Sequence, residues 1–129
     1  MRPADGIERV MTMNKKAKDM KTLEEKIGKV PVFFQGLMEK EPEMFEMVMK
    51  FDQHIWADGA LDKKTKKVIA IAIAAALRDE HAVRAQLAGA KQLGVTKEQI
   101  EEGLRVTFML SGMPAYVYGK SAMEDIMKE

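Results

Sequence analysis

The run of residues 68–77 constrains the fold most, because its ten consecutive side chains include no polar group. A helix that is apolar on every side must be covered by other elements. Ten residues are too few to cross a bilayer, which takes about 20. We therefore expect a central helix that is the most buried segment of the subunit. Its bulky side chains recur every fourth residue, and the ridge on which neighbouring helices pack is predicted to be Ile69, Ile73 and Leu77.

Helical patterns account for the rest of the chain, and no stretch alternates polar and apolar residues as a strand would. A narrow apolar seam predicts a first helix over residues 7–27, which suits packing across a subunit boundary as well as within the chain. Two prolines, Pro31 and Pro42, predict the starts of two further helices. The second ends at Trp56, and its amphipathic face is formed by Met44, Met47, Val48, Phe51 and Ile55.

Capping signals divide the second half of the chain into four helices. The signals are Asp62 before the central helix, Asp79 and Gly94 at the two ends of a helix over residues 80–93, Thr96 with Gln99 before the next helix, and Gly112 with Pro114 before the last. The chain is therefore predicted to be all-α, a single-domain bundle of about six to seven helices.

Composition excludes several classes of function. The 129 residues include 21 basic and 20 acidic side chains, a balance that argues against a general binder of nucleic acid or anionic membranes. There is no cysteine, so disulfides, thiolate nucleophiles, thiolate metal sites and dithiol redox cycling are excluded. No signal-peptide pattern or membrane-length segment is present, and we expect a soluble, cytoplasmic protein.

The polar residues directly after the apolar run are the first candidates for chemistry. Glu80 and Arg84 are spaced i, i+4, which predicts either an exposed ion pair or an arginine that binds a substrate carboxylate while Glu80 holds it in place. His81 is expected in the first turn of its helix, where the helix dipole favours the neutral imidazole. It could donate to a developing oxyanion or relay a proton, or it could be a boundary histidine.

Three further features leave alternatives open. His54 could face the same cavity as His81 or lie on the surface, and two histidines without an acidic cluster argue against a metal site. Gln86 lies among small residues, so its amide is expected either to bond across a helix contact or to line a pocket. A basic cluster is either a solvated face or a surface for an acidic partner or anionic small molecule, and comprises Lys63, Lys64, Lys66 and Lys67.

A set of short motifs points to a known family. The motifs are Trp56 with residues 59–65, residues 75–81 with Arg84, Gly94-Val95-Thr96 with Glu98 and Ile100, and Gly112-Met113-Pro114. Together they resemble the carboxymuconolactone decarboxylase family over roughly residues 43–127. The resemblance implies an N-terminal helical arm over residues 1–42 and a helical core over residues 43–129, in one domain. It also implies a homo-oligomer, a trimer or hexamer, with pockets near subunit contacts.

The family has two branches, and the residues favour one of them. In the alkyl hydroperoxidase D-like branch, a Cys-x-x-Cys pair and a following histidine act as a peroxidase relay. The corresponding positions here hold Asp79, Ala82 and Gln86, so a peroxidase is the less favoured alternative. Glu80-His81 and Arg84 resemble the decarboxylase-like branch, although a histidine common in that branch is replaced by Gln86.

The resemblance implies loss of CO2 from 4-carboxymuconolactone or a related acid, with no cofactor and no metal. In that reaction Glu80, His81 and Gln86 are the candidate catalytic residues, with His81 or His54 delivering the proton and Gln86 donating to the oxyanion. The candidate substrate-binding residues are Arg84, His54, Trp56 and Tyr116. The expected partners are a small anionic molecule and further copies of the chain. The alternative is a non-catalytic or ligand-binding oligomer of the same fold.

Overall fold

The computed structural model describes residues 30–128, which form six helices and no strand within that range. The helices are α2 (Val30–Lys40), α3 (Pro42–Trp56), α4 (Lys63–Leu77), α5 (Glu80–Leu93), α6 (Lys97–Ser111) and α7 (Met113–Ile126). The prediction of an all-α chain is confirmed. The helix predicted over residues 7–27 lies outside the described residues.

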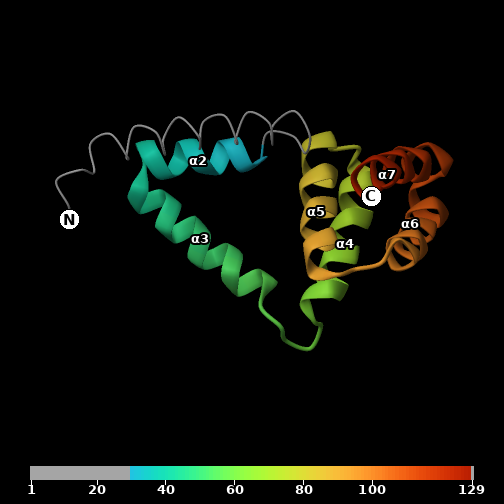
Figure 1. Cartoon of the computed structure of the whole chain (residues 1–129), viewed down its shortest axis with the longest axis horizontal. Coiled ribbons are helices and arrows are strands. Elements are labelled where there is room, and N and C mark those ends of the chain that lie inside the picture. The colour runs from blue at the N-terminus through green and yellow to red at the C-terminus, as the bar shows by residue number, and fades with distance from the viewer. Residues whose placement is uncertain (1–29, 129) are drawn as a thin grey trace.

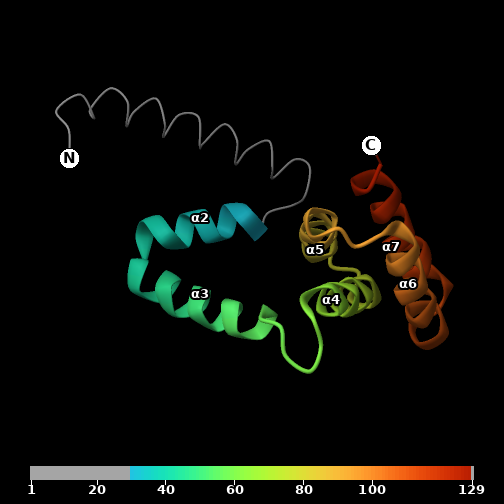
Figure 2. The ribbon, with the colours of Figure 1, turned by 60° about the horizontal axis from the view of Figure 1, so that its bottom comes forward.

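The helices form a compact body and an arm (Figure 1). In the body, α4 packs beside α5, and both contact α7, while α6 contacts α4 and α7. This arm is the V made by α2 and α3, so it reaches Trp56 and is not the same segment as the arm expected over residues 1–42. Figure 2 shows it on the side of α4 and α5 opposite to α6 and α7. Among the described residues, no helix is long and apolar enough to span a bilayer.

The predicted caps are present, and they explain where the helices begin and end. The side chain of Asp62 accepts a hydrogen bond from the Thr65 backbone at 2.8 Å. Asp79 does the same for α5, and Thr96 forms a capping box at the start of α6. Arg78 separates α4 from α5 in a left-handed conformation with φ of 56°, an unusual backbone state for a residue other than glycine.

The core lies where α4, α5, α6 and α7 meet. Its largest fully buried side chains come from three of these helices and are Ile71, Val83, Leu87, Ile100 and Leu104. The fourth helix, α7, contributes small or flexible residues such as Ala122 and Met123. Gly119 lets α7 approach closely, because a Cβ there would lie 2.6 Å from Leu104 Cδ2.

The prediction that residues 68–77 form the most buried segment of the subunit is wrong. Only Ile71, Ala74 and Ala75 of this run are buried. The bulky side chains predicted to form the packing ridge are 41%, 54% and 73% exposed in the subunit, for Ile69, Ile73 and Leu77 respectively. The reason is that α5, α6 and α7 cover one side of α4, and the described helices leave its other side open.

Candidate functional site

The predicted site residues on α5 lie on two different faces of that helix. Gln86 follows Arg84 by two positions, which places the two side chains about 200° apart around the helix axis. Gln86 contacts α4 through Lys67, whereas Arg84 contacts α7 through Asp125. The structure therefore does not bring all the predicted residues into one pocket.

One of these faces carries a cluster that joins three helices, which we call the Lys67 site. Lys67 Nζ donates to Gln86 Oε1 at 2.8 Å and lies 3.9 Å from the centre of the Trp56 ring. Trp56 in turn donates its indole N–H to Asp52 Oδ1 at 3.0 Å. The site consists of Asp52 and Trp56 from α3, Lys67 from α4 and Gln86 from α5.

Neighbouring contacts hold Trp56 and Lys67 in position relative to each other. Lys66, the preceding residue, donates to the backbone carbonyls of Ile55 and Ala57 at 2.8 and 2.6 Å, so it ties the end of α3 to α4. Gly89 leaves room for the lysine side chain, because a Cβ there would lie 3.1 Å from Lys67 Nζ. Trp56 is the last residue of α3, so its position follows directly from this attachment.

Lys67 differs from the other lysines of α4 in the surroundings of its ammonium group. Lys67 is half-buried, and this burial lowers the pKa of its ammonium from the ordinary value of 10.5, while the charge of Asp52 opposes the shift. The ammonium contacts the Trp56 ring and the Gln86 amide oxygen. The face of the aromatic ring favours the charged form of the lysine. A partly desolvated cation beside an amide that also carries N–H donors is suited to binding an anionic oxygen.

The second face of α5 carries an ion-pair network. Arg84 Nη1 lies 2.7 Å from Asp125 Oδ2, and Arg84 Nε lies 3.6 Å from Glu80 Oε2. The predicted Glu80–Arg84 pair is therefore present, and α7 supplies a second carboxylate. A substrate carboxylate at this guanidinium would share it with Asp125 and Glu80. His81 is half-buried in the first turn of α5, on the same side of the helix as Arg84.

The pKa of Tyr118, on α7, is shifted by burial and by the charges of this network. Burial raises the pKa of the Tyr118 hydroxyl above its ordinary value of 10.0, and the charges of Glu80 and Asp79 raise it further, while Arg84 opposes them. This face of α5 is thus an acid-rich surface around one arginine, with a neutral tyrosine beside it at physiological pH.

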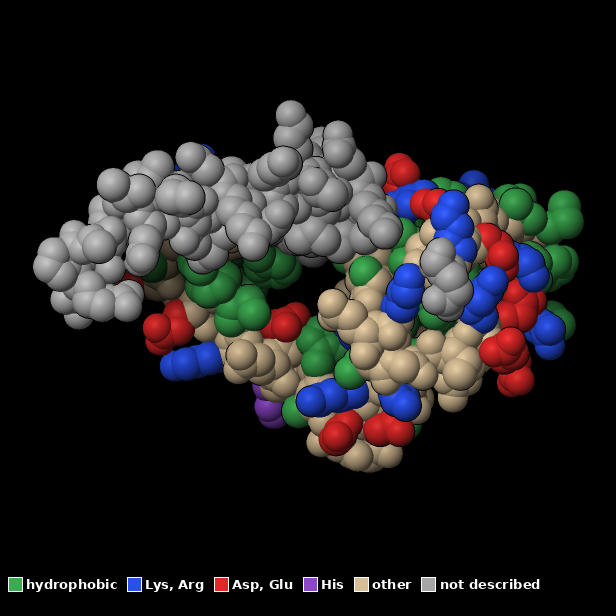
Figure 3. Space-filling view, in the orientation of Figure 1, with side chains coloured by type: hydrophobic (Ala, Val, Ile, Leu, Met, Phe, Trp, Pro, Cys, Tyr) green, Lys and Arg blue, Asp and Glu red, His purple; other side chains and the backbone are tan. Residues whose placement is uncertain are grey.

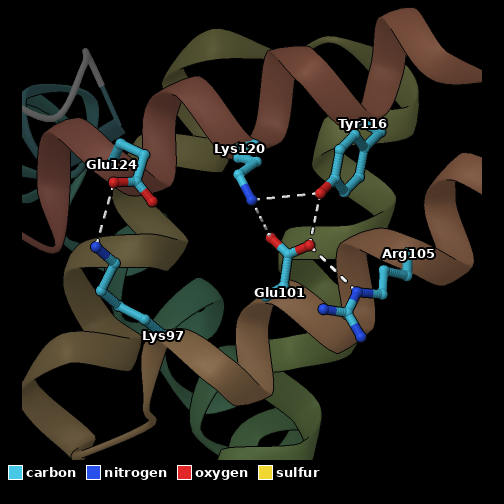
Figure 4. Close-up of polar contacts among 6 residues, drawn as sticks. All are labelled: Lys97, Glu101, Arg105, Tyr116, Lys120 and Glu124. Carbon is cyan, nitrogen blue, oxygen red and sulfur yellow. Dashed lines mark hydrogen bonds and ion pairs between the residues drawn. The ribbon is translucent and has the colours of Figure 1, made fainter.

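The remaining predicted residues, His54 and Tyr116, join neither group. His54 is exposed on α3. Tyr116 donates its hydroxyl to Glu101 at 2.5 Å, in a cluster between α6 and α7 (Figure 4). Glu101 also binds Lys120 at 3.0 Å and Arg105 at 3.2 Å. Tyr116 therefore acts in an interhelix contact and does not form a wall of the Lys67 site.

The Glu101 cluster leads to a prediction on pH and stability. The Tyr116 hydroxyl, followed by Lys120 and Arg105, holds the pKa of Glu101 below its ordinary value of 4.5, against the opposing effect of burial. The carboxylate therefore stabilises the fold above pH 4.5, and this contribution is lost as the pH falls through the lowered pKa. We expect Glu101→Gln to lower the urea midpoint at pH 7 and the gap from wild type to close under acid conditions.

The matched control for this prediction is Glu98→Gln, which removes an exposed carboxylate from the same helix. Urea unfolding followed by circular dichroism from pH 7 to pH 2, at one protein concentration, measures both variants. A gap for Glu101→Gln that stays constant over this range would show that the charge of Glu101 is not what stabilises the contact.

Lys67 is a site residue that was predicted only as one member of the basic cluster, although its position in the sequence carries a signal of its own. Lys67 precedes Ile71 by four residues and Ala75 by eight, so helical periodicity places it on the buried face of α4. Asp52 precedes Trp56 by four residues, the spacing at which two side chains meet on a helix. Within residues 30–128, no group of three or more histidines and carboxylates is placed to hold a metal ion.

The sequence of this chain is similar to those of several known proteins. The model of the carboxymuconolactone decarboxylase family matches residues 42–125. Uncharacterized protein MJ0742 of Methanocaldococcus jannaschii is 39% identical over 89 residues, which cover 68% of this chain and 86% of that protein. Uncharacterized protein 4 in the cox locus of Paracoccus denitrificans is 36% identical over 69 residues, which cover 54% of this chain and 62% of that protein.

A solved structure shows the same fold. The crystal structure of apo-lpg0406, a carboxymuconolactone decarboxylase family protein from Legionella pneumophila, superposes with a TM-score of 0.72 at 25% sequence identity. The superposition covers 82% of this chain and 95% of that one.

Proposed function

Because this chain belongs to the carboxymuconolactone decarboxylase family, we propose that it is a lyase that releases CO2 from a small carboxylated lactone or β-keto acid. We place the reaction at the Lys67 site. The observation that carries this assignment is the half-buried ammonium of Lys67, held 2.8 Å from the Gln86 amide and against the face of Trp56.

The first step of such a reaction needs a place for negative charge. The bond between the carboxylate carbon and the ring or chain carbon breaks, CO2 leaves, and the electron pair moves through the conjugated system to a carbonyl oxygen. The Lys67 ammonium and an N–H of Gln86 would stabilise the resulting enolate oxygen. Their effect is larger in a partly desolvated site, where water screens charges less. Trp56 supplies an apolar wall that limits access of water.

The second step needs a proton on carbon. A general acid works best when its pKa is near the working pH, and burial moves the pKa of Lys67 down, in that direction. Lys67 would give its proton to the enolate carbon and recover one from water. In total the substrate carboxylate and one proton become CO2 and a new C–H bond. No residue on the Arg84 face of α5 takes part in the reaction proposed here.

Purified protein incubated with a panel of β-keto acids and carboxylated lactones tests this proposal. Carbon-13 NMR follows both the released CO2 and the loss of the substrate carboxyl group. We expect turnover of at least one compound, and we expect Gln86→Leu to lower it more than His81→Gln does. The opposite ranking would move the reaction to the second face of α5.

The non-catalytic alternative has its own signature in the same experiment. Trp56 is the only tryptophan of the chain, so its fluorescence reports directly on the Lys67 site. A carboxylate that changes this fluorescence, while no compound of the panel is decarboxylated, would favour the ligand-binding alternative over the enzyme. The family's thiol-dependent peroxidase chemistry is not proposed, since the chain has no cysteine.

A further inference from the structure

The lysines within residues 30–128 differ in what their ammonium groups contact. Four of them pair with a carboxylate, and these are Lys50, Lys97, Lys120 and Lys128. Lys66 and Lys91 donate to backbone carbonyls, and three more lysines are exposed. Lys67 is the remaining one, and its only hydrogen-bond partner in this part of the chain is the neutral amide of Gln86.

The nitrogen of Lys67 contacts both α3 and α5. The centre of the Trp56 ring is 3.9 Å away, and a Cβ at Gly89 of α5 would lie 3.1 Å from Nζ. The side chain is half-buried, which leaves part of it accessible to small molecules. By contrast, Figure 3 shows Lys and Arg side chains that stand out from the surface of the body, several of them beside acidic side chains.

These surroundings favour the uncharged amine of Lys67 more than water does. Burial lowers the pKa of Lys67 from the ordinary value of 10.5, and the charge of Asp52 opposes this shift without forming an ion pair in the described structure. At a given pH, a larger fraction of Lys67 than of an exposed lysine is therefore uncharged. An uncharged lysine amine in a partly desolvated place is a nucleophile toward carbonyl carbon.

We propose that Lys67 is also a covalent site for small uncharged aldehydes, which its amine binds as an imine. The nitrogen lone pair attacks the carbonyl carbon, and a proton moves to the former carbonyl oxygen. This oxygen then leaves as water while the C=N bond forms. In total, one amine and one aldehyde give one imine and one water, so the step needs no oxidant, reductant or metal.

The Lys67 site fits an uncharged aldehyde with a short apolar group. The face of Trp56 offers an apolar surface to that group, and Gly89 leaves space beside the nitrogen. The protonated imine keeps a positive charge, which the aromatic ring stabilises, and its N–H can still donate to the Gln86 oxygen. Asp52 disfavours an anionic aldehyde, and the Lys67 nitrogen in its charged form disfavours a cationic one.

Such an imine would occupy the nitrogen to which the proposed decarboxylation assigns the proton. An aldehyde of this class should therefore inhibit that reaction. The inference does not depend on the proposed function, because imine formation is measured on a compound that has no carboxyl group.

Reductive trapping of the folded, full-length protein tests the inference. Propanal is the probe, and sodium cyanoborohydride reduces the imine to a stable N-propyl lysine that peptide mass spectrometry locates. We expect Lys67 to be labelled several-fold faster than Lys50, the exposed lysine of α3 that pairs with Glu46. The α-amino group of the chain also reacts, and it is scored in its own peptide.

Asp52→Asn distinguishes a tuned amine from one that is simply accessible. Asparagine keeps an oxygen for the Trp56 indole N–H but removes the charge that favours the ammonium of Lys67. Labelling of Lys67 should therefore become faster, whereas a loosened site would return the lysine to water and make labelling slower. The matched control is Glu46→Gln, which removes an exposed carboxylate from the same helix and should leave the labelling of Lys67 unchanged.

Three results would overturn the inference. The first is equal labelling of Lys67 and Lys50 in the folded protein. The second is the same preference for Lys67 in protein unfolded by urea, which would assign the reactivity to the local sequence and not to the site. The third is a rate in Asp52→Asn that is unchanged or lower than in the natural protein.

Discussion

Replacement of Lys67 by methionine is expected to lower kcat for the proposed decarboxylation by about 100-fold or more, the usual effect of losing a general acid. Methionine is similar in length and keeps the contact with Trp56, but it removes both the charge and the proton. The loss should appear mainly in kcat. The reason is that the ammonium stabilises the enolate oxygen formed during the reaction more strongly than it stabilises the bound substrate. Steady-state kinetics on a substrate identified by the CO2 assay measure this effect.

The pH dependence of turnover separates a catalytic Lys67 from a structural one. If the ammonium is the acid, kcat falls as the pH rises through the pKa of Lys67, which burial places below 10.5. Lys67→Arg keeps a positive charge at every accessible pH, so the alkaline fall should disappear at a lower overall rate. A Lys67→Met enzyme with wild-type kcat, or an unchanged alkaline limb in Lys67→Arg, would exclude this lysine from the chemistry.

Lys50→Met is the matched control for the Lys67 variants. Lys50 is an exposed lysine of α3 that pairs with Glu46 on the helix surface, so its replacement should leave kcat unchanged. Circular dichroism of the same samples checks folding, since Lys67 lies 3.9 Å from the Trp56 ring and its replacement alters the surroundings of the only tryptophan directly. A loss of rate in both variants would point to a general effect of charge, and not to the Lys67 site.

The contact between Leu104 and Gly119 is expected to produce the largest change in stability. Leu104 is completely buried, and Leu104→Ala should lower the free energy of unfolding by about 2–5 kcal/mol through lost packing and an empty cavity. Gly119→Ala should cost about 1–3 kcal/mol, because the new methyl lies 2.6 Å from Leu104 Cδ2 and 2.9 Å from Ala75 Cβ.

The double variant tests whether these two effects share one cause. Removing the Leu104 side chain opens the space that the methyl of Gly119→Ala needs, so Leu104→Ala with Gly119→Ala should lose less stability than the sum of the single variants. Urea unfolding followed by circular dichroism measures all three free energies. Protein concentration must be held constant, since assembly would shift the apparent stability. Additivity within about 0.5 kcal/mol would contradict the close contact.

The sequence determined the helices and their ends, because these depend on residues near each other in the chain. Asp62, Asp79 and Thr96 cap helices where predicted, and Gly94 ends α5 in the left-handed conformation expected of it. A capping hydrogen bond spans three residues, so its donor and acceptor can be read together. The i, i+4 spacing of Glu80 and Arg84 was sufficient for their ion pair for the same reason.

The sequence also determined the family, because several motifs along the chain had to agree. Those motifs resembled carboxymuconolactone decarboxylases, and the family match over residues 42–125 confirms that membership. The sequence named Gln86 and Trp56 as site residues, and the structure places both against Lys67. It could not connect them, because Lys67 is 19 residues from Gln86 and the contact exists only after α4 and α5 have paired.

Only the tertiary structure decided which surfaces are covered. Hydrophobicity showed that α4 needs neighbours on every side, but it did not show that the helices within residues 30–128 supply them on one side only. The directions of α3 and α6 leave Ile69 and Ile73 open and divide the residues of α5 between two faces. These outcomes depend on how helices far apart in the sequence are oriented, and no local pattern of side chains encodes that orientation.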